Sequence, residues 1–213
     1  MKQLVKKIKI NTTITLLTGM HIGGSKENVE IGGIDNPVIK LASKGDQPYI
    51  PGSSLKGKMR CLLEQVAGAV KVGDDTEVNN MFGTIKGTTQ PSKIIVRDAY
   101  LTEKSLELFK NSPSLDMPYT ENKFENTIDR VKGVAEHPRQ TERVPAGAEF
   151  AVEFILNVWD DDADGSNLLK MLEHGIALIE SDYLGGSGSR GYGQVKFGEL
   201  VKVELTPENN WKA

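Results

Sequence analysis

The order of strand-like and helix-like segments constrains the fold of this chain most. Strand-like segments alternate apolar and polar side chains, whereas helix-like segments repeat apolar side chains every three or four residues. In chain order, a strand, a helix, two strands, a helix and a last strand are expected over residues 6–17, 53–67, 93–101, 150–158, 166–183 and 195–205. This order predicts an α+β fold with a ferredoxin-like core.

The pattern inside these segments supports that order. Phe150, Val152 and Phe154 alternate with polar or small neighbours, as in a half-buried strand. The apolar stripes expected of the two helices are Leu55, Met59, Leu62 and Val66, and Leu168, Leu172, Ile176 and Ile179. The last strand is expected to be bulged at Gly198. RNA-recognition modules share this order of elements, so we expect a modified module of that kind.

Two long insertions interrupt the core. Residues 19–51 lose periodicity and are rich in glycine, proline and asparagine, and residues 103–143 are charged and weakly periodic. Long ordered loops are usually functional. The length of the chain suits one domain, so we predict a single domain over residues 1–213 that carries both insertions.

Composition narrows the class of protein. A formal net charge of −3 argues against a protein that coats nucleic acid by bulk electrostatics, although it allows a local basic groove. The single cysteine, Cys61, excludes an internal disulfide framework and suits a reducing cytoplasm. The lysines near the amino terminus are followed by no long apolar run, so we expect no signal peptide and no membrane partner.

The stretch Gly185–Gly193 contains five glycines in nine residues, together with Arg190 and Tyr192. Glycine permits positive φ and lets another molecule approach the backbone closely, for instance at Gly188. A guanidinium and an aromatic ring would suit a partner with phosphates and flat bases, such as RNA. The alternative is a tight turn that leads into the strand at residue 195.

A second candidate site begins the first predicted helix. Ser53 can cap this helix, and Ser53 and Ser54 place free backbone N–H groups at an end that favours anions. Lys56 and Arg60 share a helix face, with Lys58 between them, and could extend a path for phosphates. The alternative is an ordinary surface helix with solvated lysines. A nucleotide-binding P-loop is excluded, because Met59 stands where that motif needs serine or threonine.

Two further candidates lie in the first insertion. His21, followed by Gly23 and Gly24, could donate to a phosphate or stack on a base, or it could be a strand-end histidine with a backbone partner. Asp35 follows a double glycine, and a lone carboxylate there could bind a divalent ion or activate a 2′-hydroxyl. It could equally be a turn residue before Asn36.

Other motifs are weaker. The acidic run at Asp160, Asp162 and Asp164 resembles the start of a calcium loop, but Met171 stands at the twelfth position, so we interpret the run as a solvated turn with an acidic helix cap. The histidines and Cys61 lack zinc spacing. Basic residues such as Arg130 and Arg139 alternate with acids in the second insertion, which is either a solvated hairpin or an arm that contacts RNA or a neighbouring subunit.

The ordered set of these motifs resembles a known family more specifically than any one motif does. The motifs are residues 19–24, 32–37, 50–57, 81–83 and 185–193. Together they resemble, over essentially the whole chain, the repeated backbone subunit of type III-A (Csm) CRISPR effector complexes in the RAMP superfamily. The resemblance implies a CRISPR guide RNA, a target RNA, head-to-tail copies of the chain and other subunits of the type III-A effector complex as partners.

The resemblance also implies roles for residues. Asp35 falls where the family carries the aspartate that cleaves target RNA, with a divalent metal ion, Mg²⁺ or Mn²⁺, and attack by the neighbouring 2′-hydroxyl. The segment 121–143 is similar to the thumb hairpin that the family wedges into the guide–target duplex. The residues expected to contact RNA are His21, Gly23, Gly24, Ser53, Ser54, Lys56, Lys58, Arg60, Arg130, Arg139, Gly188, Arg190 and Tyr192.

Two other functions remain open at this point. A non-catalytic RNA-binding filament subunit would share the motifs but would not need the carboxylate at Asp35. An enzyme that binds a small nucleotide with its glycine loops is less consistent with the sequence, because the P-loop spacing is absent.

Overall fold

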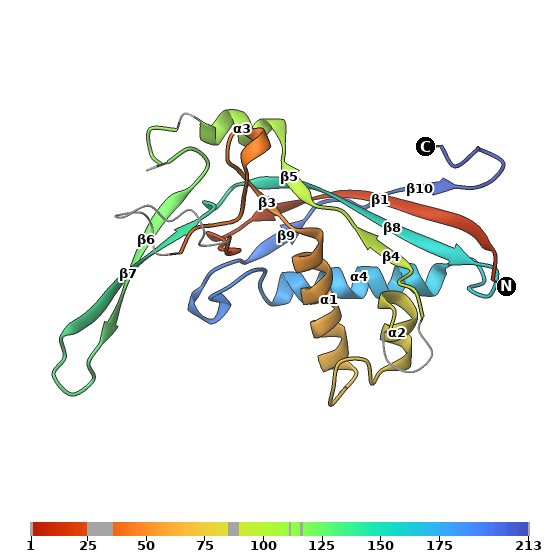
Figure 1. The fold of residues 1–213 in the computed structure, drawn as a ribbon, viewed down its shortest axis with the longest axis horizontal. Helices are drawn as coiled ribbons and strands as arrows, with labels where there is room; N and C mark the ends of the chain where they lie inside the picture. Colours follow the sequence, from red (N-terminus) through yellow and green to blue (C-terminus); the bar gives the residue numbers. More distant parts are fainter. Residues whose placement is uncertain (1, 25–35, 85–89, 111, 116, 213) are drawn as a thin grey trace.

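The computed structural model describes residues 2–24, 36–84, 90–110, 112–115 and 117–212. Its main sheet has the strand order β10 (Val201–Leu205), β1 (Leu4–Leu16), β8 (Glu149–Trp159), β5 (Ala99–Leu101), β3 (Gln47–Ile50) and β2 (Lys40–Leu41). In addition, β4 (Ile94–Val96) lies beside β8, and β9 (Val195–Phe197) lies beside β1. The helices α1 (Gly52–Val66), α2 (Thr76–Phe82) and α4 (Ser166–Ser181) lie on one side of this sheet (Figure 1). Among the described residues, no helix is long and apolar enough to cross a membrane.

The centre of the sheet is the antiparallel pair of β1 (Leu4–Leu16) and β8 (Glu149–Trp159). Ile10 faces Phe154 and Ile14 faces Phe150 across this pair, and all four side chains are fully buried. Side chains alternate between the two faces of a strand, so the predicted alternation directly gives this apolar face.

The helices α1 (Gly52–Val66) and α4 (Ser166–Ser181) cover this apolar face, and α2 (Thr76–Phe82) packs beside α1. Gly175 lets α1 and α4 approach closely, because a Cβ at this position would lie 2.4 Å from Met59 Cγ. The predicted stripe of α4 is buried in full. The predicted apolar stripe of α1 is buried except at Val66, which is 60% exposed at the end of the helix, so the prediction is wrong at this position.

The core follows the predicted order of strands and helices, and the α+β class is confirmed. The last strand lies beside the first, and the first lies beside β8, which is the antiparallel arrangement expected of a ferredoxin-like core. Two expected strands are interrupted. The second becomes β4 (Ile94–Val96) and β5 (Ala99–Leu101), and the last becomes β9 (Val195–Phe197) and β10 (Val201–Leu205).

Each interruption coincides with a contact to a segment distant along the chain. The carboxylate of Asp98, between β4 and β5, accepts a hydrogen bond from the backbone N–H of Gly52, the first residue of α1. Gly198 follows β9, where its N–H donates to Thr13 O at 2.9 Å. A Cβ there would lie 2.7 Å from Thr13 Oγ1, so a side chain at Gly198 would require the Thr13 hydroxyl to move.

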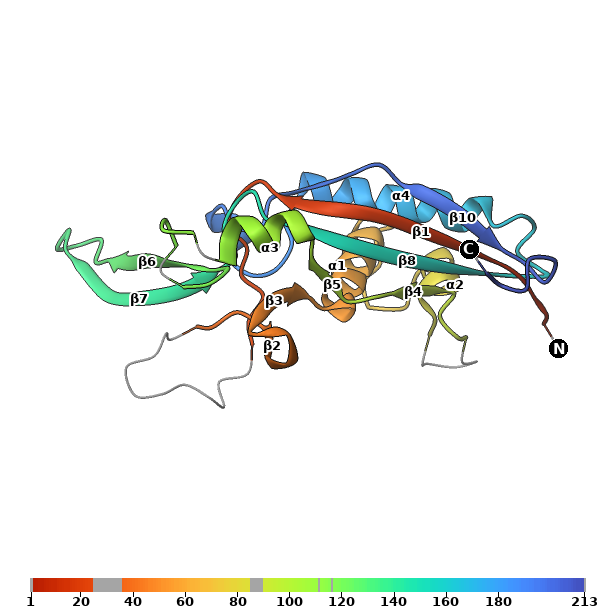
Figure 2. The same cartoon turned by 90° about the horizontal axis from the view of Figure 1, so that it is seen from above.

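The insertions extend this core at one end. The described part of the first insertion contains β2 (Lys40–Leu41), a short 3-10 turn (Ala42–Lys44) and β3 (Gln47–Ile50). The second contains α3 (Glu103–Lys110) and a hairpin of β6 (Glu121–Ile128) and β7 (Ala135–Arg143). This hairpin forms its own two-stranded sheet and projects away from the body in both views (Figures 1 and 2).

Candidate RNA interface

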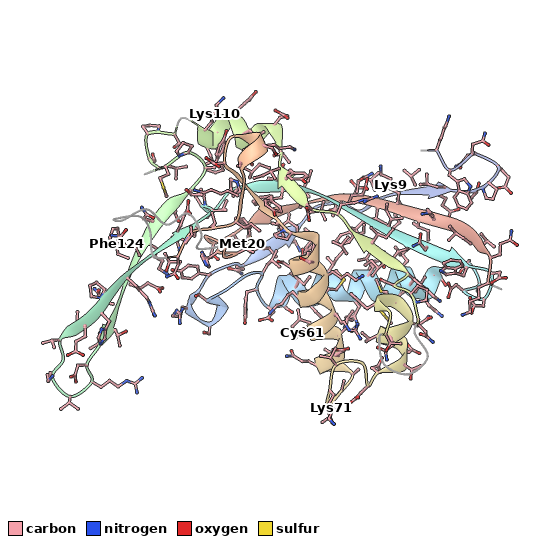
Figure 3. The ribbon with its side chains drawn as sticks, viewed as in Figure 1. Lys9, Met20, Cys61, Lys71, Lys110 and Phe124 are labelled. Atoms are coloured by element: carbon pink, nitrogen blue, oxygen red, sulfur yellow. The ribbon has the colours of Figure 1, made fainter. Side chains whose placement is uncertain are left out.

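The end of β1, the base of the β6–β7 hairpin and the glycine loop 185–193 meet in one place. Met20, which follows β1 and is labelled in Figure 3, exchanges backbone hydrogen bonds with Val144, just beyond β7, at 2.9 and 2.8 Å. Gly193 N donates to Gly19 O at 3.0 Å, which attaches the glycine loop to the same strand end. Most of the predicted site residues lie around this junction.

The first insertion leaves and returns at this junction. Gly24 N donates to Pro37 O at 3.0 Å, and Gly23 forms a bridge with Val38. Asp35, the predicted catalytic residue, lies outside the described residues. Its neighbour Asn36 accepts a hydrogen bond from Glu142 N at 3.0 Å, so the chain directly after residue 35 is fixed to the base of the hairpin.

Glu142 connects the segments of this junction, a role that no sequence pattern predicts. Its side chain is 1% exposed. One carboxylate oxygen accepts Val38 N–H at 2.9 Å, and the other accepts the Thr120 hydroxyl at 2.7 Å and lies 2.5 Å from Lys40 Nζ. A buried carboxylate is stable only with such partners. In the sequence, Glu142 is one acid among many in a charged segment.

His21 is held by Glu142 through its backbone. Nδ1–H of the ring donates to Glu142 O at 2.7 Å, because a carbonyl oxygen can only accept. The predicted alternative of a strand-end histidine with a backbone partner is therefore correct for Nδ1. The same bond occupies Nδ1 and leaves Nε2, which lies beside Gly23, as the nitrogen that could meet a ligand.

The glycine loop is a turn that leads into β9, and its backbone packs closely against neighbouring segments of the chain. Gly185 and Gly193 have φ of +86° and +70°, and a Cβ on either would lie 2.4 Å or less from a carbonyl oxygen, that of His21 or Leu184. These two glycines are therefore required by the fold itself. Gly186 N donates to His21 O at 2.8 Å, so the loop and His21 are positioned together.

Tyr183, just before the glycine loop, connects this loop to α1. Its ring fills the space that a Cβ on Gly188 would need, 2.0 Å away. Lys58 Nζ lies 3.7 Å from the centroid of the same ring and 2.7 Å from the Asp182 carboxylate. Lys58 is therefore at the contact between helix and loop.

The start of α1 differs from the prediction. Pro51 occupies the N-cap position without a side-chain bond, so Ser53 is not the cap. Gly52 N–H donates to the Asp98 carboxylate at 2.8 Å, and Ser54 N donates to Pro51 O at 3.0 Å. An aspartate of the chain itself therefore holds the position where an anion was expected, while Ser53 is exposed.

Lys56 and Arg60 share a face but point into the protein. Lys56 Nζ donates to Ser92 Oγ at 2.7 Å and to Ile94 O at 3.2 Å, and burial, helped by nearby Arg60, lowers the pKa of this lysine. The Arg60 guanidinium donates to Glu64, to Asn79 and to the carbonyl of Gly83 at 2.9 to 3.1 Å. Both residues join α1 to its neighbours, and their contact with RNA stays a prediction.

Tyr192 is 1% exposed, so its ring is not available to stack on a base in this structure. Its hydroxyl donates to Glu125 on β6 at 3.1 Å. Burial, together with this bond, raises the pKa of the Tyr192 hydroxyl. Arg190, in the same loop, is half exposed and lies 3.8 Å from the Glu125 carboxylate.

The hairpin presents an apolar surface that the sequence analysis missed. Phe124, Ile128, Val131 and Val134 are each about half exposed or more, up to 95% at Val131. Arg130 is exposed at the tip, and Arg139 lies 3.6 Å from Glu125 near the base. Exposed apolar side chains gathered on one projecting element indicate a surface for a partner.

The described residues do not form a metal site. No group of three histidine, cysteine or acidic side chains among them could hold an ion. The incomplete calcium motif has a structural role instead, because Asp162 pairs with the buried Lys93 and accepts Trp159 N–H at 3.0 Å. Asp164 accepts Ser166 N–H at 2.9 Å just before α4, but the N-cap residue is Gly165, so the predicted acidic cap is wrong.

Known proteins resemble the chain over almost its full length. It is 43% identical to "CRISPR system Cms endoribonuclease Csm3" of Methanocaldococcus jannaschii over 92% of this chain and 81% of that protein. The same name describes a Streptococcus thermophilus protein that is 44% identical over 91% of this chain and 88% of that protein.

Solved structures also contain chains that are similar to this one. The Csm3-Csm4 subcomplex in the type III-A CRISPR-Cas interference complex contains a chain that is 31% identical, with a TM-score of 0.63 over 98% of this chain and 84% of that chain. A chain of the Type III-B Cmr-beta complex bound to cognate target RNA shares the fold, with a TM-score of 0.65 at 17% identity over 93% of this chain and 61% of that chain. The RAMP superfamily model matches residues 13–196. The chain therefore belongs to the RAMP superfamily and, within it, to the Csm3 family.

Proposed function

We propose that this protein is the guide-binding backbone subunit of a type III-A CRISPR effector complex and that it cleaves guide-paired target RNA in antiviral defence. The observation that carries the proposal is the anchoring of Asn36 to Glu142. It fixes the chain beside Asp35 where β1, the hairpin and the glycine loop meet. Relatives at 43% and 44% identity that carry the name endoribonuclease support the same function.

The two sides of the junction have different tasks in this proposal. The guide RNA lies along the contact between α1 and the glycine loop, where Lys58, Gly188 and Arg190 are found. The target strand lies on the side of Asp35 and the hairpin. Phosphate contacts carry no base information, so we expect little preference for guide sequence.

The proposed cleavage is an internal transfer of the phosphoryl group. The 2′-oxygen attacks the adjacent phosphorus, its proton passes to a base, and the 5′-oxygen of the next nucleotide leaves with a proton. In-line attack requires a splayed nucleotide, because a stacked duplex holds the 2′-oxygen out of line. A single carboxylate at position 35 predicts slow chemistry that depends mainly on orientation.

We also propose that cleavage requires Mg²⁺ or Mn²⁺. The described side chains do not bring together three ligands for such an ion, and we propose that Asp35 and RNA phosphates contribute its ligands. Removal of divalent ions by a chelator is expected to stop cleavage and to leave guide binding intact.

The decisive experiment is Asp35→Asn in the assembled complex. We expect target cleavage to be lost while the complex still holds its guide and binds target. Asp46→Asn is the matched control, because Asp46 is an exposed acid of the same insertion. Retained cleavage by Asp35→Asn would contradict the catalytic role, and a wild-type complex that binds but never cleaves would indicate a non-catalytic filament subunit.

The partners follow from the same proposal. Head-to-tail copies of the chain would extend along one guide, and other subunits of the complex would cap the filament. The lone Cys61 is consistent with a cytoplasmic complex, since no disulfide framework is possible. A discrete short RNA that co-purifies with the protein would support this assembly.

A further inference from the structure

We propose that Glu125 is an internal counter-ion that RNA phosphate replaces when the protein binds RNA. This inference rests on the proposed function, because it concerns the same RNA surface. Lys123, Arg139 and Arg190 form the proposed phosphate-binding cluster. Without RNA, the Glu125 carboxylate takes the place of the phosphate.

Glu125 stands between the hairpin and the glycine loop. Its carboxylate is 13% exposed and accepts the Tyr192 hydroxyl at 3.1 Å. Lys123 Nζ, Arg139 Nε and Arg190 Nε lie 3.6, 3.6 and 3.8 Å from the same carboxylate. One carboxylate is therefore shared by cations that come from β6, β7 and the loop.

The N···O distances of these three ion pairs are long. A charge-assisted hydrogen bond to a carboxylate is typically about 2.7–2.9 Å long, and all three cations lie beyond that distance. The side chains of Arg139 and Arg190 are 45% and 52% exposed, so solvent weakens their attraction to Glu125 further. A phosphate that offers these cations closer oxygens would replace the carboxylate at little cost.

The charge of the cluster also favours an anion. Arg143 is closely paired with Glu121 at 2.6 Å, which leaves Glu125 as the shared partner of the other three cations. Lys123 and Arg143 also face the buried Tyr192 ring, 4.3 and 5.3 Å from its centroid. The ring holds both cations at the base of the hairpin, so the positive charge is already positioned before RNA arrives.

The cluster lies on the path between the two parts of the proposed interface. Arg190 belongs to the glycine loop, whose Gly186 is bonded to His21. Arg139 belongs to β7, which ends one residue beyond Glu142. RNA that crosses from the loop to the hairpin would pass these cations.

A neutral replacement separates this role from a purely structural one. Glu125→Gln keeps an oxygen that can accept the Tyr192 hydroxyl, but it removes the charge that holds the three cations. If Glu125 only ties the hairpin to the loop, the glutamine variant should bind RNA as the wild type does, or more weakly.

The experiment measures binding of labelled oligouridine to the full chain over a series of salt concentrations. We expect Glu125→Gln to bind about threefold to tenfold more tightly at low salt, because the loose ion pairs that compete with RNA are gone. The advantage should shrink as salt rises, with a steeper dependence of affinity on salt.

Glu173→Gln is the matched control. Glu173 pairs with Lys202 at 2.8 Å on the exposed surface of α4, so its replacement makes the same change in net charge away from the cluster. Equal effects of the two variants would overturn the inference, as would weaker binding by Glu125→Gln. A wild-type chain that fails to bind RNA would contradict the proposed function itself.

A second variant, at one of the cations, tests the cluster independently of how well Glu125→Gln folds. Arg139→Gln changes an exposed side chain, and we expect it to weaken binding and to reduce the gain from Glu125→Gln in the double variant. Adding the complementary strand distinguishes the source of the phosphate. A gain that is larger with the duplex than with oligouridine alone assigns the target, and a gain of equal size assigns the guide.

Discussion

The buried carboxylate of Glu142 accepts the backbone N–H of Val38 at 2.9 Å, across 104 positions of the sequence. This bond joins the base of the hairpin to the returning end of the first insertion. The same residue holds Asn36 through its N–H and His21 through its carbonyl. One glutamate thus connects the segment after β1, the returning end of the first insertion and the base of the hairpin.

Loss of this carboxylate should destabilise the protein strongly. Glu142→Ala leaves the Lys40 ammonium, the Val38 N–H and the Thr120 hydroxyl without their partner. We expect the free energy of unfolding to fall by about 3–5 kcal/mol in urea titrations. Glu204→Ala removes an exposed partner of Lys6 and should cost no more than about 1 kcal/mol. Similar losses in both variants would contradict the organising role of Glu142.

Gly57 offers a test of close approach by RNA. A Cβ added to this helical glycine meets nothing within 4 Å, so the fold alone does not require it. We expect Gly57→Ala to raise the free energy of unfolding by up to about 1 kcal/mol, because alanine favours the helix. The same variant should bind RNA more weakly if the backbone of RNA lies against this turn of α1. Unchanged affinity would place the RNA elsewhere.

Tyr192 should make stability sensitive to alkaline pH. Burial and the bond to Glu125 raise the pKa of its hydroxyl, so the unfolded chain releases this proton first as the pH rises. The protonated Tyr192 hydroxyl makes its full contribution to the free energy of unfolding below about pH 10, the pKa of tyrosine in the unfolded chain. This contribution is lost as the pH rises through the higher pKa of the folded chain. Urea titrations from neutral to alkaline pH should show a steeper decline for the wild type than for Tyr192→Phe. Parallel curves would refute this linkage.

The exposed face of the hairpin should matter for RNA and little for folding. Phe124 is 67% exposed, so Phe124→Ser should change the free energy of unfolding by less than about 0.5 kcal/mol. If the hairpin separates guide and target as the family resemblance implies, target cleavage should fall while guide binding persists. Val70→Ser, at a residue 88% exposed between α1 and α2, is the control and should leave cleavage unchanged. Cleavage at the wild-type rate by Phe124→Ser would exclude this contact.

Local patterns predicted the central elements well. Alternation along β1 and β8 and the stripe of α4 are consequences of side-chain periodicity, which a short window of sequence already contains. The interruption near Gly198 was also visible, because glycine in a strand often marks a close approach of another segment. The break at Asp98 was not visible, since it depends on a bond to the distant N-terminus of α1.

The candidate site shows the limit of sequence reasoning more clearly. The motifs around His21 and in the glycine loop were found, and the structure brings both to one junction with the hairpin. Lys56 and Arg60 had the spacing of a phosphate-binding face, but their side chains point to β4 and α2. Spacing on a helix shows which side chains share a face, and it does not show which face the protein covers.

Local sequence patterns were sufficient to predict the α+β core, the order of its strands and helices, and the family to which the motifs belong. Which polar side chains are buried became visible only in the folded chain. Glu142 and Tyr192 resemble their solvated neighbours in the sequence, yet both lose their water because segments distant along the chain close over them. Desolvation depends on these long-range contacts, and it gives Glu142 and Glu125 their separate roles at the proposed RNA surface.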